Sequence, residues 1–350
     1  MSETPLDAAA YYRWSLSPED RARLPRYDKL VDALADSEIA CHLLVEARPG
    51  QRNPMLVLAA LHYSALAGDE VLAPLYGAIT ETAPDAFARR VVERLEARPD
   101  LVRAQLHRAT QTNEPGRSAI IRAVLRELRA RGVLQVHLID VGTSMGLNLY
   151  PDFYRVNVDD PSDVAALLME DLHGTAQSGP LPVIHQRIGI DLNPLDPENP
   201  DHVLWLRACL WPEEPQRSER FLAVLAEMKS WPRATRLQGA ANDLIDGAMA
   251  RCAVPATPVI FHSWVAAYFS MDQQTQWREL VMRHVGERAV WVYCEHPGGV
   301  KGLEPPSSDF DSPRPGGTQI VVAETGEEPV SWGWAHPHGR WIAMTPGALR

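Results

Sequence analysis

The residues best suited to chemistry lie between Val136 and Asn148, where the sequence reads V-H-L-I-D-V-G-T-S-M-G-L-N. A short apolar run ends at Asp140, and small residues then follow at every second position, namely Gly142, Ser144 and Gly146. In an α/β protein, a first parallel strand enters a tight turn of this kind beside a ligand crevice. The stretch therefore predicts a buried strand followed by a ligand-binding turn.

The charge of Asp140 discriminates between the ligands that such a turn binds. A carboxylate this close to Gly142 would repel a pyrophosphate, which argues against a dinucleotide. S-adenosylmethionine fits better, because its ammonium group would lie near the acid and its carboxylate would meet the N-terminus of a following helix. A second apolar strand over 187–191 ends in Asp191, which is placed to bind the two ribose hydroxyls, with Asn193 beside it.

Two further strands end in polar residues. The run 258–264 contains His262, and the run 289–294 is followed by Glu295 and His296. Since ligands bind beyond the carboxyl ends of parallel strands, we expect these three side chains at a catalytic centre. His262 would remove a proton from the methyl acceptor. The alternative is a histidine that holds a loop through hydrogen bonds.

Other polar segments are candidates for binding substrate or metal. The stretch 110–118 places Asn113, Glu114 and Arg117 ahead of an amphipathic helix, and Arg117 could bind a carboxylate or phosphate through two hydrogen bonds. A solvated loop with a helix cap is an equal alternative. The His336-x-His338 pair could share a metal with His296, but a structured turn is favoured because no complete metal signature occurs.

The elements that would position these residues fall into two parts. Residues 1–131 are expected to be all-helical, with a capped helix start at Ser17-Pro18 and with Phe87, Val91 and Leu95 on one helix face. Residues 132–350 are expected to form a doubly wound, mostly parallel α/β sheet with an insertion at about 150–186. Strands at 318–323 and 339–344 are expected to pair as a C-terminal antiparallel hairpin.

Several of these segments together resemble an uncharacterised bacterial family, domain of unknown function 2332. They are Gln111–Arg117, the G-x-S-x-G-L-N-L stretch ending at Leu149, Gly189–Leu195, Leu204–Ala208 with Trp211-Pro212, and His336–Gly339. The segment Asp140–Gly146 also resembles the first motif of Rossmann-like methyltransferases, with Ser144 in place of the usual middle glycine. That resemblance implies an adenine contact at Asn242 or Asp243, for which a helix cap is the alternative.

The composition of the chain limits the classes of protein to which it can belong. The 350 residues are 45% apolar and carry a formal net charge of −11, with the basic residues dispersed, so nucleic acid is a poor partner. No apolar run reaches membrane-spanning length, and the first ten residues lack a secretory signal, so we expect a cytoplasmic protein. The four cysteines are too far apart for a C-x-x-C site.

The sequence thus predicts methyl transfer from S-adenosylmethionine to a small molecule. In this hypothesis the cofactor is bound by Asp140, Gly142, Ser144, Gly146, Asn148, Asp191, Asn193, Asn242 and Asp243, and the acceptor by Asn113, Glu114, Arg117 and His338. A binding protein that keeps the fold without catalysis is the second hypothesis. A metal-dependent hydrolase that uses the histidines is the third. The oligomeric state and the acceptor are left open.

Overall fold

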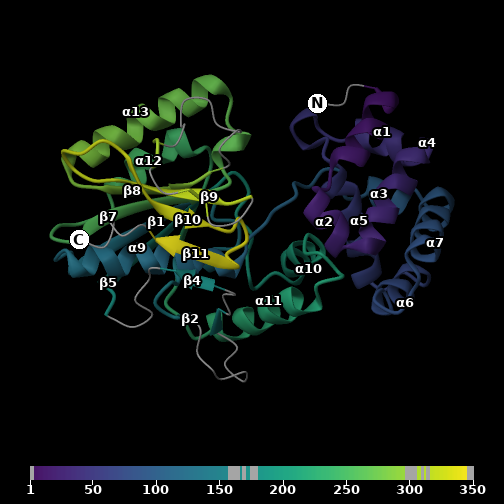
Figure 1. The fold of residues 1–350 in the computed structure, drawn as a ribbon, viewed down its shortest axis with the longest axis horizontal. Helices are drawn as coiled ribbons and strands as arrows, with labels where there is room; N and C mark the ends of the chain where they lie inside the picture. The colour runs from purple at the N-terminus through teal and green to yellow at the C-terminus, as the bar shows by residue number, and fades with distance from the viewer. Residues whose placement is uncertain are drawn as a thin grey trace. The chain divides into compact units, whose positions relative to one another are not determined.

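A computed structural model of the chain describes residues 4–156, 166–167, 171–173, 180–295, 306–308, 311–312 and 316–344. The chain divides into two compact units (Figure 1). One, the helical unit, comprises residues 1–112 and 196–222. The other, the sheet unit, comprises residues 113–195 and 223–350. About half of the expected insertion at about 150–186 lies outside the described residues.

This division differs from the boundary expected after residue 131. Helix α9 (Ser118–Ala130) groups with the sheet, and the chain returns to the helical unit at residue 196. The reason is packing: Trp205 of α10 (Pro200–Ala208) is buried in the hydrophobic core of the helical unit. The N-terminal region and the helical unit are therefore not the same set of residues.

The helical unit is built from short helices, most of which begin with proline. A proline at the first helical position loses no hydrogen bond, and its ring restricts φ to a helical value. The unit contains α1 (Pro5–Trp14), α2 (Pro18–Arg23), α3 (Pro25–Asp36), α4 (Glu38–Glu46), η1 (Pro49–Gln51), α5 (Pro54–Leu66), α6 (Leu72–Gly77), α7 (Pro84–Ala97), α8 (Asp100–Arg103), α10 and the first part of α11 (Pro215–Met228).

Two expectations for this region are confirmed. Ser17 caps α2, its side chain accepting a hydrogen bond from the backbone N–H of Asp20 at 3.1 Å. Phe87, Val91 and Leu95 lie on the buried face of α7. No helix in the described part of the chain is long and apolar enough to span a membrane.

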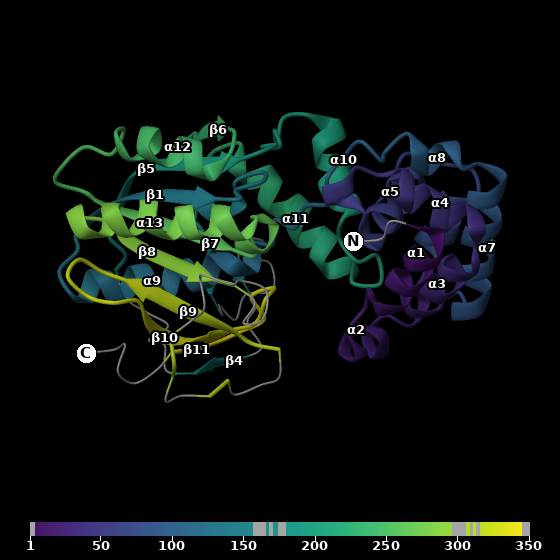
Figure 2. The ribbon, with the colours of Figure 1, turned by 90° about the horizontal axis from the view of Figure 1, so that it is seen from above.

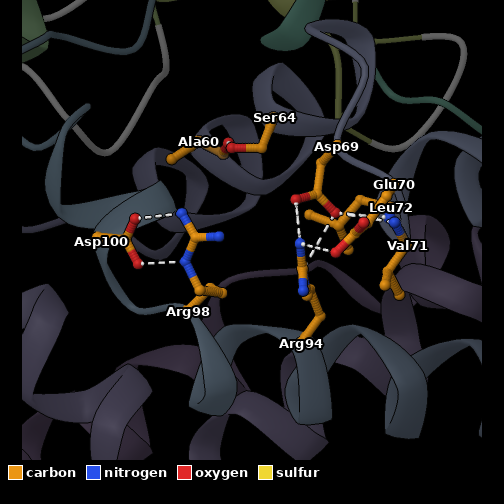
Figure 3. Close-up of polar contacts among 9 residues, drawn as sticks. All are labelled: Ala60, Ser64, Asp69, Glu70, Val71, Leu72, Arg94, Arg98 and Asp100. Atoms are coloured by element: carbon orange, nitrogen blue, oxygen red, sulfur yellow. Dashed lines mark hydrogen bonds and ion pairs between the residues drawn. The ribbon is translucent and has the colours of Figure 1, made fainter.

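Arginine–carboxylate pairs connect the loops of the helical unit, and Figure 3 shows two of them. Arg94 on α7 binds Asp69 through Nε and Nη2, and Asp69 also accepts the backbone N–H groups of Val71 and Leu72 at the start of α6. Burial acts to raise the pKa of Asp69, but these hydrogen bonds outweigh it and lower that pKa. By contrast, the pair of Arg98 and Asp100 is about half exposed.

The sheet unit contains a block of five parallel strands in the order β6-β5-β1-β7-β8. Their bounds are β1 (Gln135–Val141), β5 (Val183–Asp191), β6 (Thr235–Gln238), β7 (Thr257–Ser263) and β8 (Val290–Cys294). Numbered along the chain, this order is 3-2-1-4-5, the arrangement of Rossmann-like doubly wound sheets. In such sheets the direction of winding reverses beside the first strand, here between β1 and β7. The strands lie close to the expected positions.

Helices cover both faces of this sheet (Figures 1 and 2). Helices α12 (Ala241–Met249) and α13 (Met271–Glu287) lie on one face, and α9 lies on the other. Alternate residues of the strands point to the α12/α13 side, where Ile139, Ile190 and Ile260 share one core with Trp277. The intervening residues of β1, including Asp140, therefore point to the opposite face.

The C-terminal strands differ from the expected hairpin. β9 (Thr318–Ala323) is antiparallel to β8, β10 (Val330–Ala335) is antiparallel to β9, and β11 (Trp341–Met344) is antiparallel to β10. The direct pairing of 318–323 with 339–344 was wrong, because β10 lies between them. The sequence favours a structured turn over Trp332–Gly339, whereas residues up to Ala335 form the end of β10. Short strands also occur at β4 (Asp171–His173), which pairs with β11, and at β2 (Arg155–Val156) and β3 (Ala166–Leu167).

Two smaller corrections concern helices. After Gly146 the chain forms only a single 3₁₀ turn, η3 (Leu147–Leu149), and no α-helix occurs among the described residues between β1 and β5. The helix N-terminus expected beside the glycine turn is therefore missing from the described structure. The segment 236–243 is a strand only to Gln238, and Asn242 and Asp243 lie in the first turn of α12.

Candidate functional site

The turn after β1 has an unusual backbone conformation. Gly142, Ser144 and Gly146 have φ values of 73°, 52° and 86°, which is the left-handed region that favours glycine. Ser144 and Trp264, with φ of 60°, are the non-glycine residues of the described chain with positive φ. They follow β1 and β7, which are neighbouring parallel strands. Strained backbone of this kind is concentrated at functional sites, so this edge of the sheet is the candidate site.

Asp191 at the end of β5 holds the turn in this conformation. Its Oδ2 accepts the backbone N–H of Ser144 at 2.8 Å, and its Oδ1 accepts the N–H of Asn193 at 2.8 Å. The N–H groups of Gly142 and Thr143 donate to the carbonyl of Ile190. The structure thus brings together the predicted acid and the predicted turn, and gives Asp191 a positioning role that the sequence did not indicate.

Asp140 is buried below this turn, with 3% of its surface exposed. Its Oδ2 and the hydroxyl of Thr143 have no hydrogen-bond partner among the described residues. The pKa of Asp140 is raised to about 7, mainly by burial; the neighbouring Thr143 and the charge of Arg117 act to lower this pKa, and the charge of Asp191 acts to raise it. The end of β1 therefore holds a carboxyl group that titrates near neutral pH.

The polar segment 110–118 lies against the glycine turn. Asn113 Oδ1 accepts the N–H of Leu147 at 3.0 Å, and Ser118 donates to Asn148 Oδ1 at 3.0 Å. Glu114 caps the short η2 turn (Pro115–Arg117). Asn113 and Asn148 are thus buried residues that hold two loops together, and the buried Glu114 stabilises its own turn. The sequence could predict their polarity but not these partners, which are about 30 residues away.

Arg117 reaches a third segment. Its Nε donates to the carbonyl of Pro337 at 2.8 Å, and its Nη1 donates to the carbonyl of Ser263 at 3.4 Å. The backbones of Gly116 and Gly339 are in close contact, since a Cβ on Gly116 would lie 2.6 Å from the carbonyl oxygen of His338. The turn containing His338 is therefore part of the same cluster, as its assignment to substrate binding requires.

His262 and Glu295 are paired, as expected for neighbouring strand ends. His262 Nδ1 lies 2.7 Å from Glu295 Oε1, and the Trp277 indole N–H donates to His262 Nε2 at 3.2 Å. The geometry fixes the neutral tautomer with the proton on Nδ1, because Nε2 accepts a hydrogen bond. The side chains of His262 and Glu295 are only 1% and 2% exposed. In this arrangement both ring nitrogens are occupied, and the histidine positions the glutamate.

The remaining candidates lie apart from this cluster or outside the described residues. The Asn242 amide donates to the carbonyl of Gln273 on α13 at 3.2 Å, and Asp243 is exposed. His296 lies outside the described residues. Within those residues, no three His, Cys, Asp or Glu side chains are grouped to hold a metal ion.

Sequence reasoning missed several members of the cluster. Trp277 is one of the buried residues on α13, and its spacing with Val281 and Val285 indicates a core face but not its bond to His262. The side chain of Thr143, which the sequence did not single out, fills the space over Gly189 that a Cβ would occupy. Val265 similarly fills the space over Gly142.

Together, the sheet order and the polar cluster at its carboxyl edge define a mixed α/β protein with a Rossmann-like sheet. The chain belongs to a family described as uncharacterised proteins conserved in bacteria, domain of unknown function 2332, whose sequence model matches residues 9–344. The family resemblance noted from the sequence is thus confirmed. No curated protein and no solved structure matches the chain.

Proposed function

We propose that this protein binds S-adenosylmethionine at the carboxyl ends of β1 and β5 and transfers its methyl group to a small-molecule acceptor. The observation that carries the proposal is the buried Asp140 carboxyl, whose Oδ2 has no partner among the described residues. A buried carboxylate without a partner is unfavourable, and a cationic group bound beside it removes that cost. The ammonium group of S-adenosylmethionine is such a cation.

Asp191 supports the same ligand. Each of its carboxylate oxygens accepts one backbone N–H, and each retains a second lone pair for a ribose hydroxyl. The residue lies at the end of β5, the strand next to β1. Asp140 pairs with Gly189, and Asp191 is two residues further along β5, so the side chains of the two acids lie on the same face of the sheet. The charge of Asp191 is close enough to Asp140 to raise the pKa of the Asp140 carboxyl.

Methyl transfer also suits the buried state of His262. The sulfonium is already an activated leaving group, so the protein mainly aligns the acceptor with the methyl group and excludes water. A solvent-exposed general base is therefore not required. His262 would act by fixing Glu295, which in turn accepts the backbone N–H of Val265 at 3.0 Å.

Calorimetric titration with S-adenosylmethionine and S-adenosylhomocysteine tests the proposal. We expect both to bind, because both carry the ammonium and the ribose. Asp140→Asn, which removes the charge at nearly constant size, should weaken binding by about 2 kcal/mol, the value typical of a hydrogen bond to a charged group. Asp191→Asn should weaken it less than Asp191→Ala.

The control is Asp272→Asn, which changes an exposed acid in the first turn of α13 and should leave affinity unchanged. Absence of heat with either compound at millimolar concentration, for a protein shown to be folded, would exclude the proposed cofactor. Equal affinity of the wild-type protein and Asp140→Asn would exclude the assigned role of Asp140.

A binding protein without catalysis is the second candidate. It is favoured by the occupied ring nitrogens of His262 and by Val265, which fills the space directly over Gly142. The two candidates differ in turnover. Release of S-adenosylhomocysteine from bound S-adenosylmethionine in a screen of metabolite acceptors supports the enzyme, whereas binding with no release throughout supports the second candidate.

A further inference from the structure

Arg117 is a buried cation that forms no ion pair with a described residue. The residue is 6% exposed, and its side chain donates hydrogen bonds to two backbone carbonyls, those of Pro337 and Ser263. Burial lowers the pKa of Arg117, and the more distant charges of Glu114 and Glu295 only partly offset this. Buried charges are normally paired, because an isolated one costs several kcal/mol. The guanidinium therefore has the character of an anion-binding group.

The backbone around Arg117 holds it in place. The close contact of Gly116 with Gly339 fixes the short turn that carries the side chain, since either Cβ would collide with backbone atoms of the other turn. Ser263, whose carbonyl binds Nη1, is the last residue of β7. The guanidinium is thus directed to the end of β7, and its charge also acts on Asp140 at the end of β1. This places it beside the expected cofactor.

Glu295 provides a complementary group next to the same strand end. Its Oε1 is used by His262 and by the backbone N–H of Val265. Its Oε2 is buried and has no hydrogen-bond partner among the described residues. Glu295 is also among the charges that act on Arg117, so the two groups are neighbours. One open donor and one open acceptor therefore lie at the ends of β7 and β8.

We propose that the methyl acceptor is a small amino or hydroxy carboxylic acid. Arg117 binds its carboxylate, and Glu295 Oε2 accepts a hydrogen bond from its N–H or O–H group. That this ligand accepts a methyl group rests on the proposed function. The binding of a carboxylate at this site does not. A carboxylate is favoured over a phosphate because Glu114 and Glu295 already surround Arg117 with negative charge, which disfavours a dianion. Arg117 suits the carboxylate through Nη2, because Nε and Nη1 already donate to backbone carbonyls and a hydrogen bond between two charged groups is stronger than one between neutral groups.

Thermal unfolding of the wild-type protein with individual compounds tests the ligand class. The probes are the proteinogenic amino acids, lactate and malate, each at millimolar concentration, together with the methyl ester of every compound that binds and with inorganic phosphate. We expect at least one carboxylate to raise the Tm and its methyl ester to have no effect. The inference is overturned if no carboxylate raises the Tm, if the esters act equally, or if phosphate binds more tightly than every carboxylate.

Two variants assign the effect to Arg117. Arg117→Gln should weaken the carboxylate by about 30-fold or more, the equivalent of about 2 kcal/mol for removing one partner of a buried charge pair. Arg122→Gln is the matched control, because Arg122 on α9 also donates to a backbone carbonyl, that of Pro151 at 3.0 Å. If Arg117→Gln does not fold, the comparison of acid with ester in the wild-type protein still decides the question.

The same titrations separate this inference from the proposed function. Arg117→Gln should retain the wild-type affinity for S-adenosylhomocysteine. Loss of that affinity would instead assign Arg117 to the cofactor and overturn the inference. If carboxylates bind in an Arg117-dependent manner and S-adenosylmethionine does not bind, the anion site stands and the proposed methyl transfer fails.

Discussion

The buried side-chain atoms of the sheet unit that lack a hydrogen-bond partner in the described chain include Oδ2 of Asp140, Oγ1 of Thr143 and Oε2 of Glu295. All three residues lie at or just beyond the carboxyl ends of β1 and β8. Folding normally satisfies such atoms, because each unpaired one costs about 1–3 kcal/mol. These three atoms lie at the edge of the sheet where Ser144 and Trp264 have strained backbone, which supports the proposal of a ligand site there.

At the residue scale, the pKa of Asp140 makes a prediction about pH. Because the folded-state pKa is raised from its usual value near 4 to about 7, the unfolded state releases this proton at lower pH than the folded state. The contribution of Asp140 to folding stability is therefore greatest below pH 4 and is lost as pH rises to about 7. We expect the stability of the wild-type protein relative to Asp140→Asn to fall by up to about 4 kcal/mol over this range.

Urea unfolding of both proteins at pH values from 4 to 8 measures this difference. A difference that stays constant with pH would show that Asp140 titrates normally. Affinity for S-adenosylmethionine should change in the opposite direction, since a cation requires the ionised acid. It should rise as pH increases through 7 and should show no such rise in Asp140→Asn.

At the element scale, loops and helix starts in the helical unit depend on pairs such as those in Figure 3. Asp69 both caps the start of α6 and pairs with Arg94 on α7, and the two side chains are 7% and 13% exposed. Helix α6 has only six residues, which is too few for a helix to be stable without tertiary contacts. The pair thus connects a short helix to a longer one.

We expect Arg94→Ala to destabilise the protein by about 2–4 kcal/mol, because it leaves the mostly buried Asp69 carboxylate without its charged partner. Arg98→Ala is the matched control. It removes an equally short bidentate pair with Asp100 that is about half exposed, and it should cost less than about 1 kcal/mol. Chemical denaturation of the two variants measures both values. Equal losses would contradict the assignment of the cost to burial.

At the scale of the whole molecule, the chain leaves the sheet unit after residue 195 and returns after residue 222. Each unit contains its own hydrophobic core. The residues assigned to the carboxyl edge of the sheet, from Asn113 to Arg117 and from Asp140 to Asn193, belong to the sheet unit. The proposed cofactor site is therefore complete within one unit.

Hydrogen–deuterium exchange with saturating S-adenosylhomocysteine tests this point. We expect increased protection in residues 140–148 and 189–195, because ligand binding stabilises the structure that forms the site. Helices α3 to α8 of the helical unit should exchange at unchanged rates. Protection of those helices would show that the helical unit takes part in binding and would contradict the assignment to one unit.

The sequence by itself determined the helix starts, the parallel strands and the family. These depend on local features: prolines and capping side chains fix helix ends, and runs of apolar residues fix buried strands. The position of β10 was not predictable in this way, because its six residues include a glycine and end beside two histidines. Its identity depends on pairing with β9 and β11.

Only the tertiary structure decided which polar residues remain open to a ligand. Asn113, Asn148 and His262 have the same residue types as a binding site, but their hydrogen bonds go to distant parts of the chain. Arg117 and Asp140 differ from these residues. Folding buries both, but among the described residues Arg117 has no ion pair and one oxygen of Asp140 has no hydrogen-bond partner. The physical reason is that residue type sets what a side chain can bind, whereas its neighbours in space decide whether that capacity is already used.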